Sequence, residues 1–269
     1  MIKAIFFDID GTLVSFHTHV IPQSAIRAIA AAHAKGVKIF IATGRPGVII
    51  NNLSALQERN LIDGYITMNG AYCLVGDEVV YKSAIPAADV HTLAQLSVAR
   101  NFPCIFVGEH DLCLNRPDRQ VQQVFLNYLE VTSLPVKEPS TIGLQDIYQM
   151  TPFITTAQEQ EILPLLHGCE SNRWFPAFAD LTACGNTKQH GIDEIVRRFG
   201  LPLQETMAFG DGGNDTGMLQ HAGIGIAMGN AADEVKRYAD YVTDTVDNDG
   251  IVKALLHFGI VSESDLSDL

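Results

Sequence analysis

The stretch IKAIFFDIDGT, residues 2–12, decides the fold that this chain is expected to adopt. Its apolar run, Ile5 to Phe7, is typical of a buried strand in a parallel sheet. Asp8 and Asp10 follow that strand, and Gly11 then turns the chain. In open α/β sheets ligands bind beyond the carboxyl ends of the strands, so the two carboxylates lie where a functional site is expected.

Asp8 and Asp10 are close enough for their negative charges to repel each other, and burial strengthens that repulsion. A divalent metal ion with oxygen ligands would relieve it. The same residues also suit an ordinary turn, because Asp and Gly are favoured in turns. Partners further along the chain decide between these two interpretations.

The composition bounds the possible functions of the protein. Of its 269 residues, 47% are hydrophobic, which is enough for a substantial core. The formal net charge of -13 argues against nucleic-acid and anionic-membrane partners, which select for basic surfaces. Asp8 interrupts the short apolar run at the start of the chain, so no signal peptide is expected. No window reaches the ~20 apolar residues of a membrane span.

The five cysteines are odd in number and include no CxxC pair. This pattern argues against a zinc site or a disulfide framework. We expect reduced, mostly buried thiols in a cytoplasmic protein.

A second predicted strand, residues 37–42 (VKIFIA), ends in Thr43, Gly44 and Arg45. Backbone N–H groups and a hydroxyl at the start of the following segment suit a phosphate oxygen. An ordinary strand-to-helix loop would have the same pattern. A helix is expected next, over residues 48–58.

Lys188 lies just inside a predicted helix, residues 189–199, for which Thr187 is the candidate N-cap. A positive charge in the first turn opposes the helix dipole. The ammonium group is therefore expected to contact an anion, although a solvated surface lysine is the ordinary alternative.

The predicted strand over residues 206–209 ends in GDGGND, residues 210–215. Glycines, two acids and an amide pack poorly, but they suit a loop that binds a metal ion and a phosphate. Another polar stretch contains His17 and His19, which could ligate a metal ion. An exposed loop beside the site is the expected alternative.

The middle of the chain lacks strands that end in Asp or in Thr-Gly. Its helical and strand patterns alternate, which indicates an inserted α+β domain. We predict a core formed by residues 1–82 and 185–269, and an inserted domain formed by residues 83–184.

The four motifs, Asp8-x-Asp10, Thr43-Gly44-Arg45, Lys188 and the 210–215 loop, resemble those of the haloacid dehalogenase (HAD) type phosphatases in order and in residues. The resemblance covers essentially the whole chain. More narrowly, the chain is similar to the Cof-type class IIB branch, which carries an α/β cap between the second and third motifs, and within it to bacterial hexose-phosphate phosphatases. The resemblance implies an α/β fold: a HAD-like Rossmannoid core with a parallel sheet, plus an inserted α+β cap of C2B type.

The resemblance also implies roles for the core residues. Asp8 would be the nucleophile that forms an aspartyl-phosphate, and Asp10 the general acid and base. Mg²⁺ would be bound by Asp8, the backbone carbonyl of Asp10 and Asp211, with Asp215 orienting these groups. The residues that would hold the phosphoryl oxygens are Thr43, Gly44, Lys188 and Asn214.

The leaving group needs further contacts, for which the candidates are Arg45 in the core and residues of the stretch SNRWFPAFAD, 171–180. Sugar rings commonly contact an aromatic face and paired polar groups. This favours Arg173, Trp174 and Asp180, although Trp174 also suits the core of the cap.

These observations predict a Mg²⁺-dependent phosphatase for small phosphomonoesters, with sugar phosphates as the implied substrate class. A phosphomutase or a sucrose-phosphate-type phosphatase would share the same core. A phospho-receiver module also uses Asp, Thr and Lys around Mg²⁺, but it lacks an acid equivalent to Asp10 and a large insert.

Overall fold

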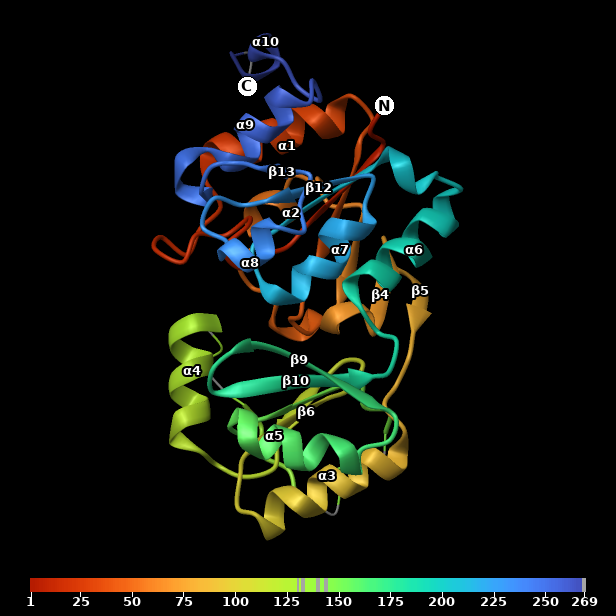
Figure 1. The fold of residues 1–269 in the computed structure, drawn as a ribbon, viewed down its shortest axis with the longest axis vertical. Helices are drawn as coiled ribbons and strands as arrows, with labels where there is room; N and C mark the ends of the chain where they lie inside the picture. Colours follow the sequence, from red (N-terminus) through yellow and green to blue (C-terminus); the bar gives the residue numbers. More distant parts are fainter. Residues whose placement is uncertain (130, 132–133, 139–140, 143–144, 268–269) are drawn as a thin grey trace. The chain divides into compact units, whose positions relative to one another are not determined.

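The computed structural model describes residues 1–129, 131, 134–138, 141–142 and 145–267. The chain divides into two compact units. The first comprises residues 1–43, 52–81 and 187–269, and the second comprises residues 44–51 and 82–186. Figure 1 shows a β-sheet in each unit.

The first unit is built on an eight-stranded sheet with the order β13-β12-β11-β1-β2-β3-β4-β5. The strand β1 lies in the middle and pairs in parallel with β2 and β11. The strand β4 pairs with β3 in the antiparallel direction. The strands are β1 (Ala4–Phe7), β2 (Lys38–Ala42), β3 (Gly64–Thr67), β4 (Tyr72–Val75), β5 (Glu78–Lys82), β11 (Thr206–Gly210), β12 (Ile224–Ala227) and β13 (Tyr241–Val242).

Helices cover both faces of this sheet (Figure 1). Phe6 and Phe40 stack on each other and belong to the apolar core that includes Ile192 and Met218 from α6 and α7. The helix α1 packs against α9 and α10. The helices are α1 (Gln23–Ala34), α2 (Ser54–Gln57), α6 (Lys188–Phe199), α7 (Thr216–His221), α8 (Asp233–Lys236), α9 (Gly250–His257) and α10 (Glu263–Ser267).

The second unit contains a five-stranded antiparallel sheet with the order β7-β6-β8-β10-β9. Its helices α3 and α5 lie along one face of the sheet (Figure 1) and bury an apolar core there. The elements are α3 (Ala87–Ala99), β6 (Cys104–Val107), β7 (Leu112–Leu114), α4 (Arg119–Leu129), β8 (Gln149–Pro152), α5 (Thr156–Ile162), β9 (Cys169–Phe175) and β10 (Phe178–Ala183). The predicted α/β fold, with a largely parallel sheet and a second α+β unit, is confirmed.

One local prediction was wrong, and one strand was missed. The helix expected over residues 48–58 is replaced by a short 3₁₀ turn (Gly47–Ile49) and the single-turn α2. Asn51 and Asn52 interrupt the pattern, and the side chain of Asn51 accepts a hydrogen bond from Arg45. Local side-chain hydrogen bonds of this kind compete with helix formation.

The strand β9, residues 169–175, was missed because most of its residues are polar or aromatic. The structure pairs β9 with β10 from Cys169 to Phe175. An antiparallel edge strand needs only one apolar face, and here the pairing with β10 decides the conformation.

Several smaller expectations concern exposure. His17 and His19 are exposed, as the loop interpretation predicted. Four of the five cysteines are buried and Cys184 is exposed. Among the described residues, no helix combines the length and the apolar character that crossing a membrane requires.

Candidate active site

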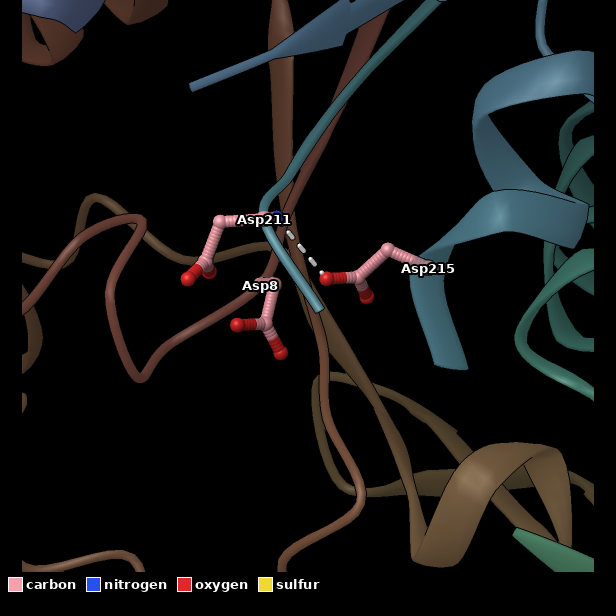
Figure 2. A group of neighbouring side chains, drawn as sticks. All are labelled: Asp8, Asp211 and Asp215. Atoms are coloured by element: carbon pink, nitrogen blue, oxygen red, sulfur yellow. Dashed lines mark hydrogen bonds between the residues drawn. The ribbon is translucent and has the colours of Figure 1, made fainter. Parts of the chain in front are cut away.

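Neighbouring parallel strands bring three of the predicted motifs to one edge of the first unit's sheet. Asp8 follows β1, Asp211 follows β11 and Thr43 follows β2, and these strands are adjacent in the sheet. Because parallel strands end at the same edge, residues far apart in the sequence meet there. Figure 2 shows the carboxylates of Asp8, Asp211 and Asp215 gathered in this way.

Lys188 links the first and the last of these motifs. Its Nζ atom donates hydrogen bonds to Oδ1 of Asp8 and Oδ1 of Asp215, each at 2.6 Å. The lysine side chain is 1% exposed, so this is a buried ion pair with two acids. Thr187 caps the helix by accepting a hydrogen bond from the backbone N–H of His190, which confirms the predicted cap. The cation in the first turn does have anions to contact.

Asp215 also shapes the loop that carries Asp211. Its Oδ2 atom accepts hydrogen bonds from the backbone N–H groups of Asp211, at 3.0 Å, and Gly212, at 2.8 Å. The first of these is the dashed line in Figure 2. Asp215 is fully buried. Its two oxygens therefore fix the loop and the ammonium of Lys188 at the same time.

The carboxylate of Asp211 is held from two further directions. Thr12 Oγ1 donates to Oδ1 of Asp211 at 2.9 Å. Asn230 Nδ2 donates to Oδ2 at 3.2 Å and to the backbone carbonyl of Gly11 at 2.8 Å. The acid is thus oriented by groups from the first turn of the chain and from the loop after β12.

Asp8 and Asp211 both have a raised pKa, so they hold their protons more tightly than ordinary carboxyls. Burial, and then the charge of Asp215, raise the pKa of Asp8 well above 3.8, against the opposing effect of Lys188. Burial and the charge of Asp215 also raise the pKa of Asp211, from 3.8 to about 7. Burial works to lower the pKa of Lys188, but Asp215 and Asp8 outweigh it, and the pKa is raised. Only when these acids are ionised does the site carry more negative charge than Lys188 balances.

Two glycines permit the close packing at this edge. Gly11 has φ +83°, and a Cβ atom there would lie 2.2 Å from Oδ2 of Asp211. Gly70 has φ +99°, and a Cβ atom there would lie 2.1 Å from the backbone oxygen of Thr187. Any side chain at either position would displace Asp211 or the start of α6, so both positions require glycine.

The other predicted core residues lie on the same loops. Asp10 follows the strand β1 and forms an isolated bridge with Val14. Its charge contributes to the raised pKa values of Asp8 and Asp211. Thr43 is buried, and its backbone oxygen accepts a hydrogen bond from the N–H of Asn69.

The amides of Asn214 and Asn69 are joined, since Asn214 Nδ2 donates to Oδ1 of Asn69 at 3.1 Å. Asn69 is 1% exposed, and among the described residues its Nδ2 atom has no hydrogen-bond partner. A buried donor without a partner costs free energy, and an anionic oxygen would satisfy it.

The remaining candidates belong to the second unit. Gly44 and Arg45 line a pocket of that unit together with Asp180. Arg45 and Asp180 are both buried. The side chain of Trp174, which lies in β9, is outside the part of the chain that the structure describes.

Arg173 is placed away from that pocket. Its guanidinium donates to Oε2 of Glu159 at 2.6 Å, and to the backbone oxygens of Pro176 and Ile154 at 3.0 Å each. These contacts tie the strand β9 to the helix α5, so this arginine fixes the unit's own structure.

Sequence reasoning missed three residues that the structure places around the acids: Thr12, Asn69 and Asn230. Thr12 was visible only as part of the turn after Asp10, and Asn69 only as a turn signal before Gly70. Asn230 lies in the tail AMGN, residues 227–230. Polar residues just after predicted parallel strands were the available signal, because such residues converge at the carboxyl edge of the sheet.

The three acids, of which Asp8 and Asp215 are buried and Asp211 is half-buried, suit a divalent cation. One ligand oxygen from each of Asp8, Asp211 and Asp215 lies within 4.8 Å of the others. Lys188 offsets one of the three negative charges when all are ionised. Carboxylate oxygens with uncompensated charge are the ligands that hard cations such as Mg²⁺ prefer. Asp215 belongs to this cluster, and the sequence analysis had predicted that it orients the metal ligands.

Comparisons with known proteins agree with this geometry. Residues 5–255 match the family model for haloacid dehalogenase-like hydrolases. The YkrA protein of Bacillus subtilis, which is named as a phosphatase, is 31% identical over 264 residues, covering 96% of this chain and 98% of its own.

Solved structures of phosphatases are also similar to this chain. The HAD subclass IIB sugar phosphatase BT4131 is 60% identical, with a TM-score of 0.93 over 96% of this chain and 100% of its own. The HAD phosphatase BT1666 of Bacteroides thetaiotaomicron is 39% identical, with a TM-score of 0.86 over 97% of this chain and 96% of its own. These matches agree with the arrangement of the acids and Lys188, and together they assign the family. The chain belongs to the haloacid dehalogenase-like hydrolase family, and within it to the phosphatases.

Proposed function

We propose that this phosphatase hydrolyses sugar phosphates, depends on Mg²⁺ and forms an aspartyl-phosphate on Asp8. The buried cluster of three acids and Lys188 is the observation that carries the proposal. The similarity to a sugar phosphatase at 60% identity supports the substrate class. We further propose that the inserted domain, residues 83–184, selects the leaving group.

The first chemical step uses the carboxylate of Asp8. Its oxygen attacks the phosphorus atom, and the bond from phosphorus to the sugar oxygen breaks. Asp10 donates its proton to that leaving oxygen. Lys188 and Asn214 would hold the phosphoryl oxygens, together with Thr43 and Gly44.

The second step regenerates the enzyme. Asp10, now ionised, removes a proton from a water molecule, which attacks phosphorus and displaces the carboxylate of Asp8. Inorganic phosphate leaves, and Asp10 holds its proton again. A bound divalent cation would be held by Asp8, Asp211 and the carbonyl of Asp10, oriented by Asp215, and would neutralise charge on the phosphoryl oxygens.

A phosphate-release screen tests the proposal. Hexose, pentose and triose phosphates and nucleotides are incubated with the protein, with Mg²⁺ and with a chelator. We expect release of inorganic phosphate that requires Mg²⁺ and is fastest with sugar phosphates. Formation of an isomerised sugar phosphate without phosphate release would indicate a mutase, and equal rates for all classes would contradict the substrate class.

Binding of Mg²⁺ is expected to strengthen as the pH rises. The pKa of Asp211 is about 7, so a proton competes with the metal ion below that pH. Loss of this proton alone predicts a Kd about 25-fold weaker at pH 5.5 than at pH 7.5, and the raised pKa of Asp8 makes 25-fold the smallest ratio expected. Isothermal titration calorimetry at both pH values measures the ratio, and an unchanged Kd would contradict it.

The raised pKa of Asp211 also predicts how the stability of the metal-free protein depends on pH. An acid whose pKa is raised in the folded state stabilises that state below the unfolded pKa, and the contribution is lost as the pH rises towards about 7. Without metal, the thermal midpoint should therefore decrease as the pH is raised from 4 to 7. An Asp211→Asn variant should show a smaller fall and is the control.

A further inference from the structure

The chain makes a tight turn, Met68–Gly70, between β3 and β4 of the first unit. All three of its residues have positive φ: +51° at Met68, +52° at Asn69 and +99° at Gly70. Glycine adopts this conformation freely and asparagine tolerates it, but methionine does so only with strain. The turn is therefore held in a conformation that its own sequence does not favour throughout.

The side chain of Asn69 adds a second cost. It is 1% exposed, and its Nδ2 atom has no hydrogen-bond partner among the described residues. Backbone strain and an unpaired buried donor both reduce the stability of the folded state. A turn that departs from the local rules in this way is more typical of a functional element than of a stabilising one.

The backbone of the turn lies against two of the segments that carry phosphate-binding candidates. The N–H of Asn69 donates to the backbone oxygen of Thr43 at 3.1 Å. Gly70 packs so closely on Thr187, the residue before Lys188, that a Cβ atom would lie 2.1 Å from the Thr187 oxygen. All these residues belong to the first unit. The position of Asn69 is thus fixed relative to both segments.

The side chain of Asn69 contacts a third segment, the loop after β11. Asn214 Nδ2 donates to Oδ1 of Asn69 at 3.1 Å, across 145 positions of the sequence. An amide nitrogen carries two N–H groups, and this bond uses one of them. The bond therefore fixes the plane of the Asn214 amide and the direction of its second N–H.

No other side-chain contact of this kind orients that amide in the part of the chain that the structure describes. Asp215 holds the loop by accepting from the N–H groups of Asp211 and Gly212, but these bonds fix the main chain. Without Oδ1 of Asn69, the amide of Asn214 could turn over and present its carbonyl oxygen. That oxygen would repel an anion, whereas the N–H attracts one.

We propose that Asn69 is a positioning residue that holds the amide of Asn214 so that its second N–H donates to a phosphoryl oxygen of the substrate. This rests on the proposed function, in which Asn214 binds the phosphoryl group. Asn69 lies outside all four sequence motifs and acts on the substrate only through Asn214. Because the role concerns the phosphoryl group, it serves every phosphomonoester equally, whatever its leaving group.

The Asn69→Gly variant tests this role. Glycine keeps the positive φ and the backbone N–H that binds Thr43, and it removes the acceptor for Asn214. We expect kcat/KM to fall about tenfold with both glucose 6-phosphate and p-nitrophenyl phosphate, and the Kd of inorganic phosphate to rise by a similar factor in calorimetry. The thermal midpoint should stay within about 3 °C of the wild type, because glycine relieves strain and an unpaired donor is lost.

The Kd of Mg²⁺ in the same variant should stay within about twofold of the wild type, because the acid cluster is unaltered. Asn60→Gly is the matched control, since Asn60 has the same φ of +52° and is exposed in the same unit. That substitution should leave the rates, both Kd values and the thermal midpoint unchanged.

A double variant separates positioning from a general structural effect. Asn214→Ala removes the amide through which Asn69 acts, so adding Asn69→Gly to it should cause no further loss beyond about twofold. Losses that multiply would overturn the proposal. So would wild-type kinetics of Asn69→Gly, unequal losses on the two substrates, a weakened Kd for Mg²⁺, or a thermal midpoint lowered by more than about 10 °C, which would assign the turn to stability.

Failure of the proposed function would be recognised separately. A wild type that hydrolyses neither substrate in the presence of Mg²⁺ would refute that function. The titrations with inorganic phosphate need no turnover, so the comparison of wild type, Asn69→Gly and the double variant would still decide whether Asn69 positions Asn214 for an anion.

Discussion

Asp8→Asn is expected to fold and to lose phosphatase activity by at least about four orders of magnitude, the scale seen when a catalytic nucleophile is removed. An amide oxygen does not form the acyl-phosphate bond that the first step requires. The fold should persist, because Lys188 keeps its contact with Asp215 and the substitution removes one of the mutually repelling charges. Initial rates with p-nitrophenyl phosphate and a thermal melt of the same preparation measure both outcomes.

Asp77→Asn is the matched control for this experiment. Asp77 is exposed in the turn between β4 and β5, and the same change there should leave rate and melting temperature unchanged. An Asp8→Asn variant that retains more than a few per cent of the activity would remove Asp8 as the nucleophile. Loss of activity together with unfolding would mean that Asp8 is needed for the ion pair with Lys188, and the nucleophile would then have to be tested by trapping phosphorylated wild-type protein.

Asp10→Asn has the second largest expected effect, a fall in kcat of about 10²–10⁴-fold for sugar phosphates, the range for loss of a general acid or base. The sugar alkoxide needs a proton to leave. The p-nitrophenolate anion is a far weaker base and leaves without one. With p-nitrophenyl phosphate the first step should therefore proceed, while the hydrolysis of the aspartyl-phosphate, which needs Asp10 as base, is slow.

Phosphorylated protein should consequently accumulate in this variant with p-nitrophenyl phosphate. Intact-protein mass spectrometry and a burst of p-nitrophenolate detect it. The Asp8→Asn/Asp10→Asn double variant, which lacks the acceptor carboxylate, should show neither. Unchanged steady-state kinetics of Asp10→Asn with sugar phosphates would contradict the acid and base role.

The core of the fold was predictable because its signals are local. The apolar run before Asp8 and the run that ends at Ala42 are long enough to identify strands, and polar residues mark where each one stops. The helix that begins at Lys188 was equally clear, since Thr187 caps it and Gly200 ends it in the left-handed conformation. Local propensity and hydrophobic pattern agree in these segments, which is the condition under which sequence reasoning succeeds.

The second unit was harder to predict because its strands depend on pairing. The strand β9 carries polar and aromatic residues, and its conformation follows from its register with β10. The failed helix over residues 48–58 had a suitable apolar pattern, but Asn51 forms a local contact with Arg45 that the pattern does not reveal. In β9 the pairing between strands, and in residues 48–58 a local side-chain contact, outweigh intrinsic propensity.

The candidate site, like the fold, could be predicted from the sequence only in part. Polar strand ends identified Asp8 and Asp211, because the carboxyl ends of parallel strands share one edge, and the first turn of a helix identified Lys188. Only the folded chain shows that Asp215 completes the buried acid cluster, and that Asn230 reaches Asp211 across 19 positions of the sequence. Hydrogen-bond geometry depends on loop conformations, and these have no period that a sequence reveals.

The sequence by itself determined that a parallel sheet ends in acids and a lysine, since strand period, turn residues and motif order are all properties of short segments. Only the tertiary structure decided that Gln149, Thr182 and Glu170, which come from three separate strands of the second unit, form one row across its sheet. A cross-strand row is set by register, and register arises from pairing between segments that are distant along the chain. The positions of the acids therefore follow from short segments of the sequence, whereas the row of Gln149, Thr182 and Glu170 forms only when the strands pair.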